Sequence, residues 1–348
     1  MRILAAAAVA VTAAVVAQVR PATVAAPVEI IRSIGGLPAH IAGRFNDQSI
    51  CRQTEAGTFL VFDRRSHTVY SVDATSTAPT EVVQIGAEPG RLLQPYAFDA
   101  RDDGTFVVAD APDNRTRIQM FLATGSRLGG FQLPAVAFPL LLDGLAITGL
   151  GSLVLSDRSV FFSQPESGSL IVERGLDGVS SRAFGELRES GHEQDKPLHA
   201  VLNSGLVVLN PEGGFYYVFV AGRPAFRKYD ALGTMIFERH IEGLELDAYM
   251  RDRPRAWPTR KAGDGQFPLV RPAVRAAAAD RSGNLWISLD VPFTYVYDRA
   301  GEKTRIVQWR GAGVLAPNGI SFTAAGQLLA TPGCYLFNVR APTKPRGR

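Results

Sequence analysis

The densest group of side chains able to bind a charged partner lies between residues 251 and 261. Five cations, one tryptophan and two prolines occur in this short stretch. Arginine can make bidentate hydrogen bonds to a carboxylate or phosphate, and tryptophan can anchor an interface as a rigid ring. The stretch therefore predicts either a loop that recognises an anion or a protein partner, or a loop whose charges only keep it in water. The candidate binding residues are Arg251, Arg253, Arg255, Trp257, Arg260 and Lys261.

Familiar catalytic patterns are absent from the sequence. The five histidines show no metal-binding spacing, and there is no serine elbow, phosphate-binding loop or dinucleotide fingerprint. His199 is predicted to begin an inner strand facing a channel, although a lone histidine is more commonly structural. The two cysteines, Cys51 and Cys334, are too few for a zinc or haem motif. They predict either a disulfide between neighbouring units or two separate buried thiols.

Short apolar runs separated by tight turns make up most of the chain. Residues 98–131 are typical of three antiparallel strands joined by turns. The core of this unit, Gly104–Asp110, matches Gly57–Asp63 and Gly151–Asp157, each 47 residues away. Looser copies begin at three further glycines, Gly205, Gly283 and Gly326. The aspartates that end the three best copies precede turns, and we expect their carboxylates to accept backbone N–H groups there.

Six copies at this spacing predict an all-β fold, a six-bladed β-propeller of four-stranded antiparallel blades. The last copy supplies only three strand-like runs, whereas Val28–Ile34 reads as a strand with no partner nearby. We therefore expect the N-terminal strand to complete the last blade and close the ring, which removes two open sheet edges. The predicted propeller is one domain over residues 28–340. Residues 242–271 are an insertion between blades four and five, with helical spacing of apolar residues over 244–250.

The segment DAPDNRTRIQMF, from Asp110 to Phe121, resembles the NHL repeat. That repeat has an aspartate, then asparagine and arginine, here Asn114 and Arg115, followed by an aliphatic–polar pair and an aromatic residue. The first copy retains Asp63 but has serine and histidine in place of the asparagine and arginine. The resemblance implies a ring with a central channel and ligand sites at one mouth. It implies no single activity, because this superfamily contains binding modules, lyases and hydrolases.

A second segment, APNGISF from Ala316 to Phe322, resembles the Pro-Asn-Gly segment of the gluconolactonase/regucalcin family. In that family the asparagine binds a divalent cation at the channel mouth, with a glutamate and an aspartate from other blades. The resemblance implies Asn318 as a metal ligand, with Ca²⁺ as the cation it would hold. A simple Pro-Asn-Gly turn explains the same residues. Hard cations need several converging oxygens, and no matching set is apparent, so no cofactor is predicted.

The N-terminus has the features of an export signal. Arg2 precedes an apolar run of 15 residues, Ile3–Ala17, which ends in small side chains suited to cleavage. The alternative is an uncleaved membrane anchor, but a span requires about 20 apolar residues. The predicted segments outside the propeller are a signal peptide at 1–17, a linker at 18–27 and a basic tail at 341–348. We expect a periplasmic or secreted protein with no membrane span in its mature chain.

Charge restricts the class of partner. The net charge of +4 is small for 348 residues and forms no basic stripe, which excludes a nucleic-acid footprint. We predict a monomeric, exported propeller that acts as a scaffold for a protein or an anionic small molecule. The alternative is a divalent-metal-dependent hydrolase or lyase, similar to gluconolactonase, with its site at the channel mouth.

Overall fold

The structure is a computed structural model. It describes residues 27–73, 75–113, 115–134, 140–142, 145–147, 152–251, 257–262 and 265–339. The predicted signal peptide, most of the linker and the basic tail lie outside the described residues, as do Asn114, Arg253 and Arg255. No helix in the described part of the chain has the length and hydropathy needed to cross a membrane.

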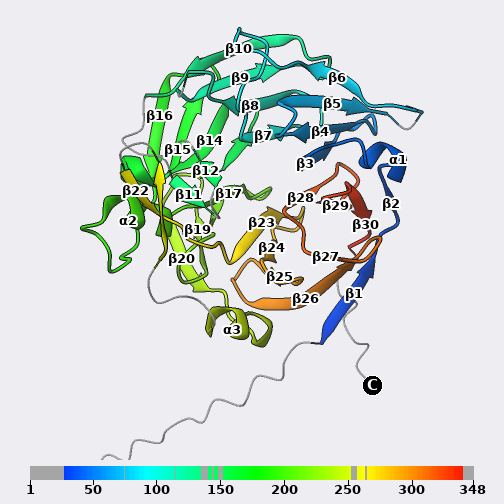
Figure 1. The fold of residues 1–348 in the computed structure, drawn as a ribbon. Coiled ribbons are helices and arrows are strands. Elements are labelled where there is room, and N and C mark those ends of the chain that lie inside the picture. The colour runs from blue at the N-terminus through cyan, green and yellow to red at the C-terminus, as the bar shows by residue number, and fades with distance from the viewer. Residues whose placement is uncertain are drawn as a thin grey trace, which may run out of the picture.

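Six blades, each built on four antiparallel strands, stand around a central axis, so the predicted all-β, six-bladed propeller is confirmed (Figure 1). In each blade the chain runs from the innermost strand to the rim. Blade one contains β3 (Gln48–Gln53), β4 (Phe59–Asp63), β5 (Thr68–Val72) and β6 (Thr80–Val83). Blade two contains β7 (Ala97–Ala100), β8 (Phe106–Asp110), β9 (Arg117–Phe121) and β10 (Arg127–Gln132). Blade three contains β13 (Leu153–Leu155), β14 (Ser159–Gln164), β15 (Ser169–Gly175) and β16 (Ser180–Phe184).

The second half of the ring repeats this order. Blade four contains β17 (Gly205–Leu209), β18 (Phe215–Phe219), β19 (Ala225–Tyr229) and β20 (Met235–His240). Blade five contains β23 (Val274–Ala279), β24 (Leu285–Leu289), β25 (Thr294–Tyr297) and β26 (Lys303–Arg310). Blade six contains β28 (Gly319–Phe322), β29 (Leu328–Thr331), β30 (Tyr335–Phe337) and, at the rim, β2 (Gly35–Gly36).

Burial explains why short apolar runs specify these strands. The second strands of the blades, such as β8 and β18, are buried at every position because neighbouring blades cover both faces. The rim strands β10 and β20 are mostly exposed. Blades therefore pack face to face through their middle strands, and strands buried on both faces read as continuous apolar runs.

The sequence copies do not all mark the same strand. The copies that begin at Gly57, Gly104, Gly283 and Gly326 lead into second strands. The copy that begins at Gly205 is the innermost strand β17, and the Leu153–Leu155 run is the innermost strand β13. The blade count is unaffected, since each blade contributes one copy.

The ring closes differently from the prediction. β1 (Val28–Arg32) pairs in parallel with β26 at the rim of blade five, so its expected pairing with blade six is wrong. Only Ile31 of β1 is buried, which explains why this segment lies on the rim. The N-terminal chain still completes blade six, through β2, which pairs antiparallel with β30.

A close backbone contact fixes this last strand. Gly36 has a φ of +143°, and a Cβ at this position would lie 2.5 Å from the carbonyl oxygen of Cys334. Cys334 also forms a disulfide with Cys51, with Cα atoms 5.9 Å apart. Blades one and six are thus joined by a covalent bond beside the β2–β30 pair.

The described elements outside the blades follow one rule. Each α-helix and each short extra strand lies between the rim strand of one blade and the inner strand of the next. The exceptions are β1 and the 3₁₀ turn η1 (Pro165–Ser167), which lies inside blade three. An antiparallel blade of four strands returns the chain to the face where it began, so all these insertions lie on that face. We call it the insertion face. Its elements are α1 (Ala39–Ala42), β11 (Leu140–Leu142), β12 (Leu145–Ile147), α2 (Lys196–Leu202), α3 (Leu244–Arg251), β21 (Thr259–Ala262), β22 (Gly265–Pro268) and β27 (Val314–Leu315).

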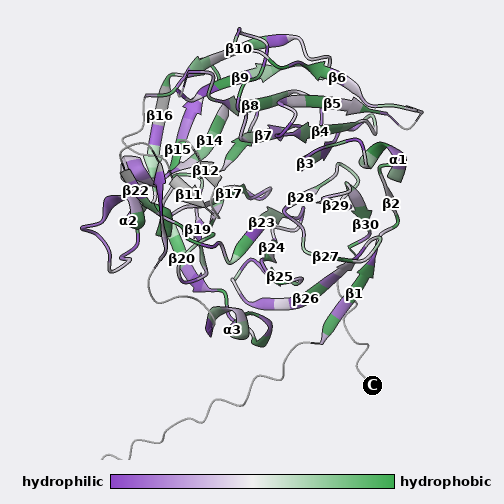
Figure 2. Ribbon diagram, viewed as in Figure 1, coloured by the Kyte–Doolittle hydropathy of each residue, from purple (hydrophilic) through white to green (hydrophobic). Residues whose placement is uncertain are grey.

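One local prediction needs correction and one is confirmed. His199 lies in α2 instead of an inner strand, because the Asp195 carboxylate accepts the Leu198 N–H and a proline occupies the first turn. The predicted helix in the 242–271 insertion is present as α3. Figure 2 shows the hydrophilic loop that precedes α2 at the edge of the ring.

Candidate functional site

The innermost strands of all six blades surround a cavity of about 170 Å³. Most of its lining residues lie in the first halves of these strands or just before them, so the cavity lies toward the insertion face. We call it the channel mouth. One lining residue from each blade is Arg52, Tyr96, Val154, Leu206, Arg275 and Asn318. The remaining lining is mostly apolar and consists of Ile50, Ala97, Phe98, Ser152, Leu153, Val207, Ala276, Ala277, Gly319 and Ile320.

The first charged pair at the channel mouth joins Arg52 and Asp99. The Nε and Nη2 atoms of Arg52 lie 2.7 and 2.6 Å from Oδ1 of Asp99. The other carboxylate oxygen, Oδ2, accepts the backbone N–H of Leu155 at 2.8 Å. One buried carboxylate therefore ties together the inner strands of blades one, two and three. Asp99 was not predicted as a site residue, because its only signal in the sequence is a charge inside the apolar run of β7.

A second arginine at the mouth is also neutralised. Arg275 Nη2 lies 2.7 Å from Oδ1 of Asp290, and Nε donates to the same atom at 2.8 Å. Asp290 follows β24, so this pair lies within blade five. Both arginines of the mouth are fixed by a carboxylate, and each retains donors for a further acceptor.

Two neutral polar side chains at the mouth have defined partners. The Tyr96 hydroxyl donates to Oγ1 of Thr116 at 2.8 Å, and burial raises the pKa of Tyr96 well above its ordinary value. The Asn318 amide oxygen accepts the Thr331 hydroxyl at 2.8 Å, and the Asn318 N–H donates to the Thr331 carbonyl at 3.0 Å. The Pro-Asn-Gly segment thus leads into β28 as a hydrogen-bonded turn.

The structure places Asn318 at the channel mouth. Among the residues described, no group of three or more His, Cys, Asp or Glu side chains converges as a metal site would require. The metal role of Asn318 stays a prediction.

Two of the three repeated aspartates, Asp63 and Asp110, have the structural role that we expected. Asp63 accepts the backbone N–H groups of Asn46, Asp47 and Ser66 at 2.7, 3.0 and 3.1 Å. Asp110 accepts the N–H of Leu93 at 3.0 Å and forms a buried ion pair with Arg117 at 2.6 Å. Asp157 differs, because its side chain is exposed and pairs with Arg101. Each of the two buried carboxylates holds the loop that enters its own blade.

The cationic insertion lies away from the cavity lining. Arg251 ends α3, and Arg260 and Lys261 lie on β21, all with exposed side chains. Trp257 is half-buried and packs against the core between blades four and five. The β22 strand contacts α2 and β11, so the insertion packs on other elements of its own face. Among the described members of this group, none lines the channel mouth.

One buried carboxyl on the insertion face was not singled out in the sequence. Glu166 lies in η1, under α2, and neither of its carboxylate oxygens has a hydrogen-bond partner. Burial raises the pKa of Glu166 to about 7, although the nearby Gln164 side chain acts in the opposite direction. A glutamate in a turn gives no sequence signal for such an environment.

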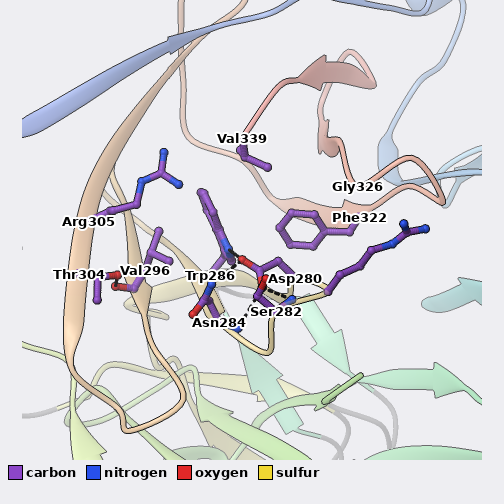
Figure 3. A pocket seen from close by; sticks show the side chains of 11 residues that line it. Asp280, Ser282, Asn284, Trp286, Val296, Thr304, Arg305, Phe322, Gly326 and Val339 are labelled. Carbon is purple, nitrogen blue, oxygen red and sulfur yellow. Dashed lines mark hydrogen bonds between the residues drawn. The ribbon is translucent and has the colours of Figure 1, made fainter. Parts of the chain in front are cut away.

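A further hollow of about 290 Å³ lies on the opposite face, between blades five and six (Figure 3). Asp280 there accepts Nε1–H of Trp286 and Nδ2–H of Asn284, both at 2.9 Å. Arg305 stacks over Trp286 at 4.9 Å and pairs with Glu29 of β1 at 2.7 Å. Asp280 and Arg305 already have partners, so this hollow reads as packing between two blades.

Comparison with known proteins adds no family. No family model and no curated protein matches the chain, so the NHL resemblance stays a prediction. A streptogramin B lyase structure is similar with 12% identity and a TM-score of 0.49, covering 83% of this chain and 78% of that one. The Xanthomonas campestris gluconolactonase XC5397 has 16% identity and a TM-score of 0.47, covering 92% and 98%. These values carry no argument about activity.

Proposed function

We propose that the protein is an exported binding module whose ligand enters the channel mouth. The observation that carries this proposal is the composition of the mouth, where apolar side chains surround two arginines that are each held by a carboxylate. Ligand pockets are typically apolar with a few fixed polar groups that orient the ligand. The channel mouth has this composition, and all six blades contribute to it.

The ligand class follows from the donors and the volume. Arg52, Arg275 and the Asn318 amide group supply hydrogen bonds to oxygen atoms, and the wall between them is apolar. A cavity of about 170 Å³ suits a small molecule or the end of a larger one. We infer a ligand with an apolar body and a carbonyl or carboxylate group.

Export is supported by the disulfide and by the sequence of residues 1–17. Disulfides form and persist in oxidising compartments such as the periplasm and the cell exterior. The Cys51–Cys334 bond is buried in the core of the ring. The proposal therefore places the mature propeller in the periplasm or outside the cell.

A pair of matched variants tests the binding proposal. Ala277 lines the channel mouth, so Ala277→Leu should fill part of it, whereas Ala231→Leu makes the same change in an exposed turn. A panel of small carboxylates, amides and lactones is screened by thermal melting. We expect at least one compound to raise the Tm of the natural protein and of A231L without raising the Tm of A277L.

The same experiment separates binding from catalysis. If no compound distinguishes A277L from A231L, the channel mouth is not the binding site. Metal analysis of the purified protein, with melts before and after chelation, runs in parallel. One tightly held divalent ion, together with metal-dependent turnover of a lactone in the panel, would replace the binding proposal with the hydrolase alternative.

A further inference from the structure

A second pocket lies on the insertion face, beside blade four and apart from the channel mouth. Its volume is about 270 Å³, and a water molecule in the liquid occupies about 30 Å³. It is formed between the loop that precedes α2, the turn after β18 and the end of β20. The polar side chains that line it are Arg188, Glu189, Ser190, Arg223, Glu238 and His240.

Arg188 is held rigidly at this pocket. Its backbone N–H donates to Oδ1 of Asn203 at 2.8 Å, and the Asn203 amide returns a bond to the Arg188 carbonyl at 3.1 Å. Its guanidinium stacks on the Phe219 ring at 4.0 Å. The acceptors of its guanidinium are the carbonyl oxygens of Arg223 at 2.7 Å, Ala221 at 2.9 Å and Leu202 at 3.3 Å. A donor fixed in this way loses little further freedom when it binds.

None of these acceptors carries a negative charge. Burial lowers the pKa of Arg188 to about 10, as expected for a poorly solvated cation, although the charge of Glu238 acts in the opposite direction. A buried cation is unfavourable until an anion compensates it. The described structure gives Arg188 no ion pair, in contrast to Arg52, Arg117 and Arg305.

The other charges around the pocket do not supply that anion. Glu238 is engaged by Arg227, whose Nε lies 2.5 Å from its carboxylate. Arg223 pairs with Glu242 at 3.5 Å, but both side chains are about 70% exposed, so that pair is weak. Glu189 is exposed at the edge of the pocket. Neither carboxylate of the lining therefore forms an ion pair with Arg188 in the described structure.

A neutral donor and acceptor completes the lining. The Ser190 hydroxyl lies 2.7 Å from Nδ1 of His199, and its oxygen also accepts the His192 N–H at 3.1 Å. These contacts fix the side chain at the pocket wall. Ser190 and the two arginines thus come from two different segments and face one cavity.

We propose that this pocket is a binding site for a small organic anion, with a carboxylate or phosphate group between Arg188 and Arg223. Planar guanidinium groups bind such oxyanions through paired hydrogen bonds. Ser190 supplies a further contact, and the volume leaves room for more of the ligand than its charged group. This site does not depend on ligand binding in the channel.

Titration with inorganic phosphate and with citrate, at constant ionic strength set by chloride, tests the proposal. We expect one of the two anions to raise the Tm in a saturable way, and the responding anion identifies the charged group recognised. Arg223→Gln should weaken its Kd about tenfold, the loss expected for one charge-assisted hydrogen bond. Ser190→Ala should weaken it less.

The matched control is Arg239→Gln, which removes the same charge from an exposed position on β20 outside the pocket. R239Q and A277L should keep the natural Kd. The proposal is overturned if neither anion acts beyond chloride, or if R239Q loses as much affinity as R223Q. In the first case Arg188 serves only to tie the loop before α2 to blade four.

Discussion

Cys51 and Cys334 are 283 residues apart in the chain, yet a disulfide joins them across the seam of the ring. Cys51 lies on β3 of blade one, and Cys334 lies in the turn between β29 and β30 of blade six. Both side chains are buried, with 2% and 0% exposure. The bond therefore resists opening of the ring at the point where its first and last blades meet.

Removing this disulfide should destabilise the protein substantially. We expect the double variant Cys51→Ala and Cys334→Ala to lose about 4 kcal/mol of unfolding free energy, because the bond restricts a very long loop in the unfolded chain. Denaturant unfolding of the oxidised protein and the double variant measures the difference. Equal midpoints would show that non-covalent contacts alone keep the seam closed.

The strand that completes blade six requires glycine at one of its two positions. Gly36→Ala should cost about 2 kcal/mol or more, because its Cβ would meet the Cys334 carbonyl in a strained conformation. A Cβ at Gly35 would have nothing within 4 Å, so Gly35→Ala should change stability by less than about 0.5 kcal/mol. Thermal melts of the two variants make the comparison, and similar losses would contradict this account.

The buried Glu166 should make stability depend on pH. Its pKa is raised from 4.5 to about 7 in the folded state, so the unfolded chain loses this proton first. Stability should therefore fall as the pH rises from 4.5 to about 7, and this contribution should then level off.

Glu166→Gln removes that ionisation. The variant should exceed the natural protein by about 2 to 3 kcal/mol at pH 8 and by little at pH 4.5, as denaturant melts at the two pH values would show. Glu189→Gln is the control, because that side chain is exposed and should leave the profile unchanged. An identical pH dependence in all three proteins would mean that Glu166 stays ionised in the fold.

The half-buried Trp257 should matter for stability more than the cations near it. Trp257→Ala should cost about 1 to 2 kcal/mol, because the ring packs against the core between blades four and five. Lys261→Ala should change stability by less than about 0.5 kcal/mol, since its side chain is exposed. Thermal melts of both variants test this. An unchanged Tm for W257A would show that packing of the ring contributes little to stability.

The blade count could be predicted because each blade needs one strand that is buried on both faces. Such strands appear as continuous apolar runs after glycine turns, for example β4 and β8. The position of each run within its blade could not be predicted, because the innermost strands β13 and β17 are also largely buried. The apolar pattern of a strand indicates that it is buried, but it does not indicate which neighbouring strands or blades bury it.

Ring closure was predictable only in outline. The last blade lacked a strand and the N-terminal segment had no partner, which is enough to connect the two. Val28–Arg32 nevertheless pairs with blade five, since one buried side chain does not distinguish between two adjacent rims. Gly35 and Gly36 gave no strand signal, because glycine has no side chain to show alternation.

The candidate sites depended on contacts between residues far apart in the sequence. Asp99 of blade two pairs with Arg52 of blade one, and Arg188 has no ion pair among the described residues. Neither relationship produces a local pattern in the sequence. The cationic residues between 251 and 261 do form such a pattern, but a high density of charge does not indicate whether a loop faces a cavity.

The direction of β1 determines how the propeller would be presented if it were attached through its N-terminus. β1 runs parallel to β26, and β26 ends at the insertion face. Val28 therefore begins β1 at the opposite end of the ring. An anchor joined to the chain before Val28 would hold the propeller by that end, so the channel mouth and the Arg188 pocket would point away from the surface that carries it.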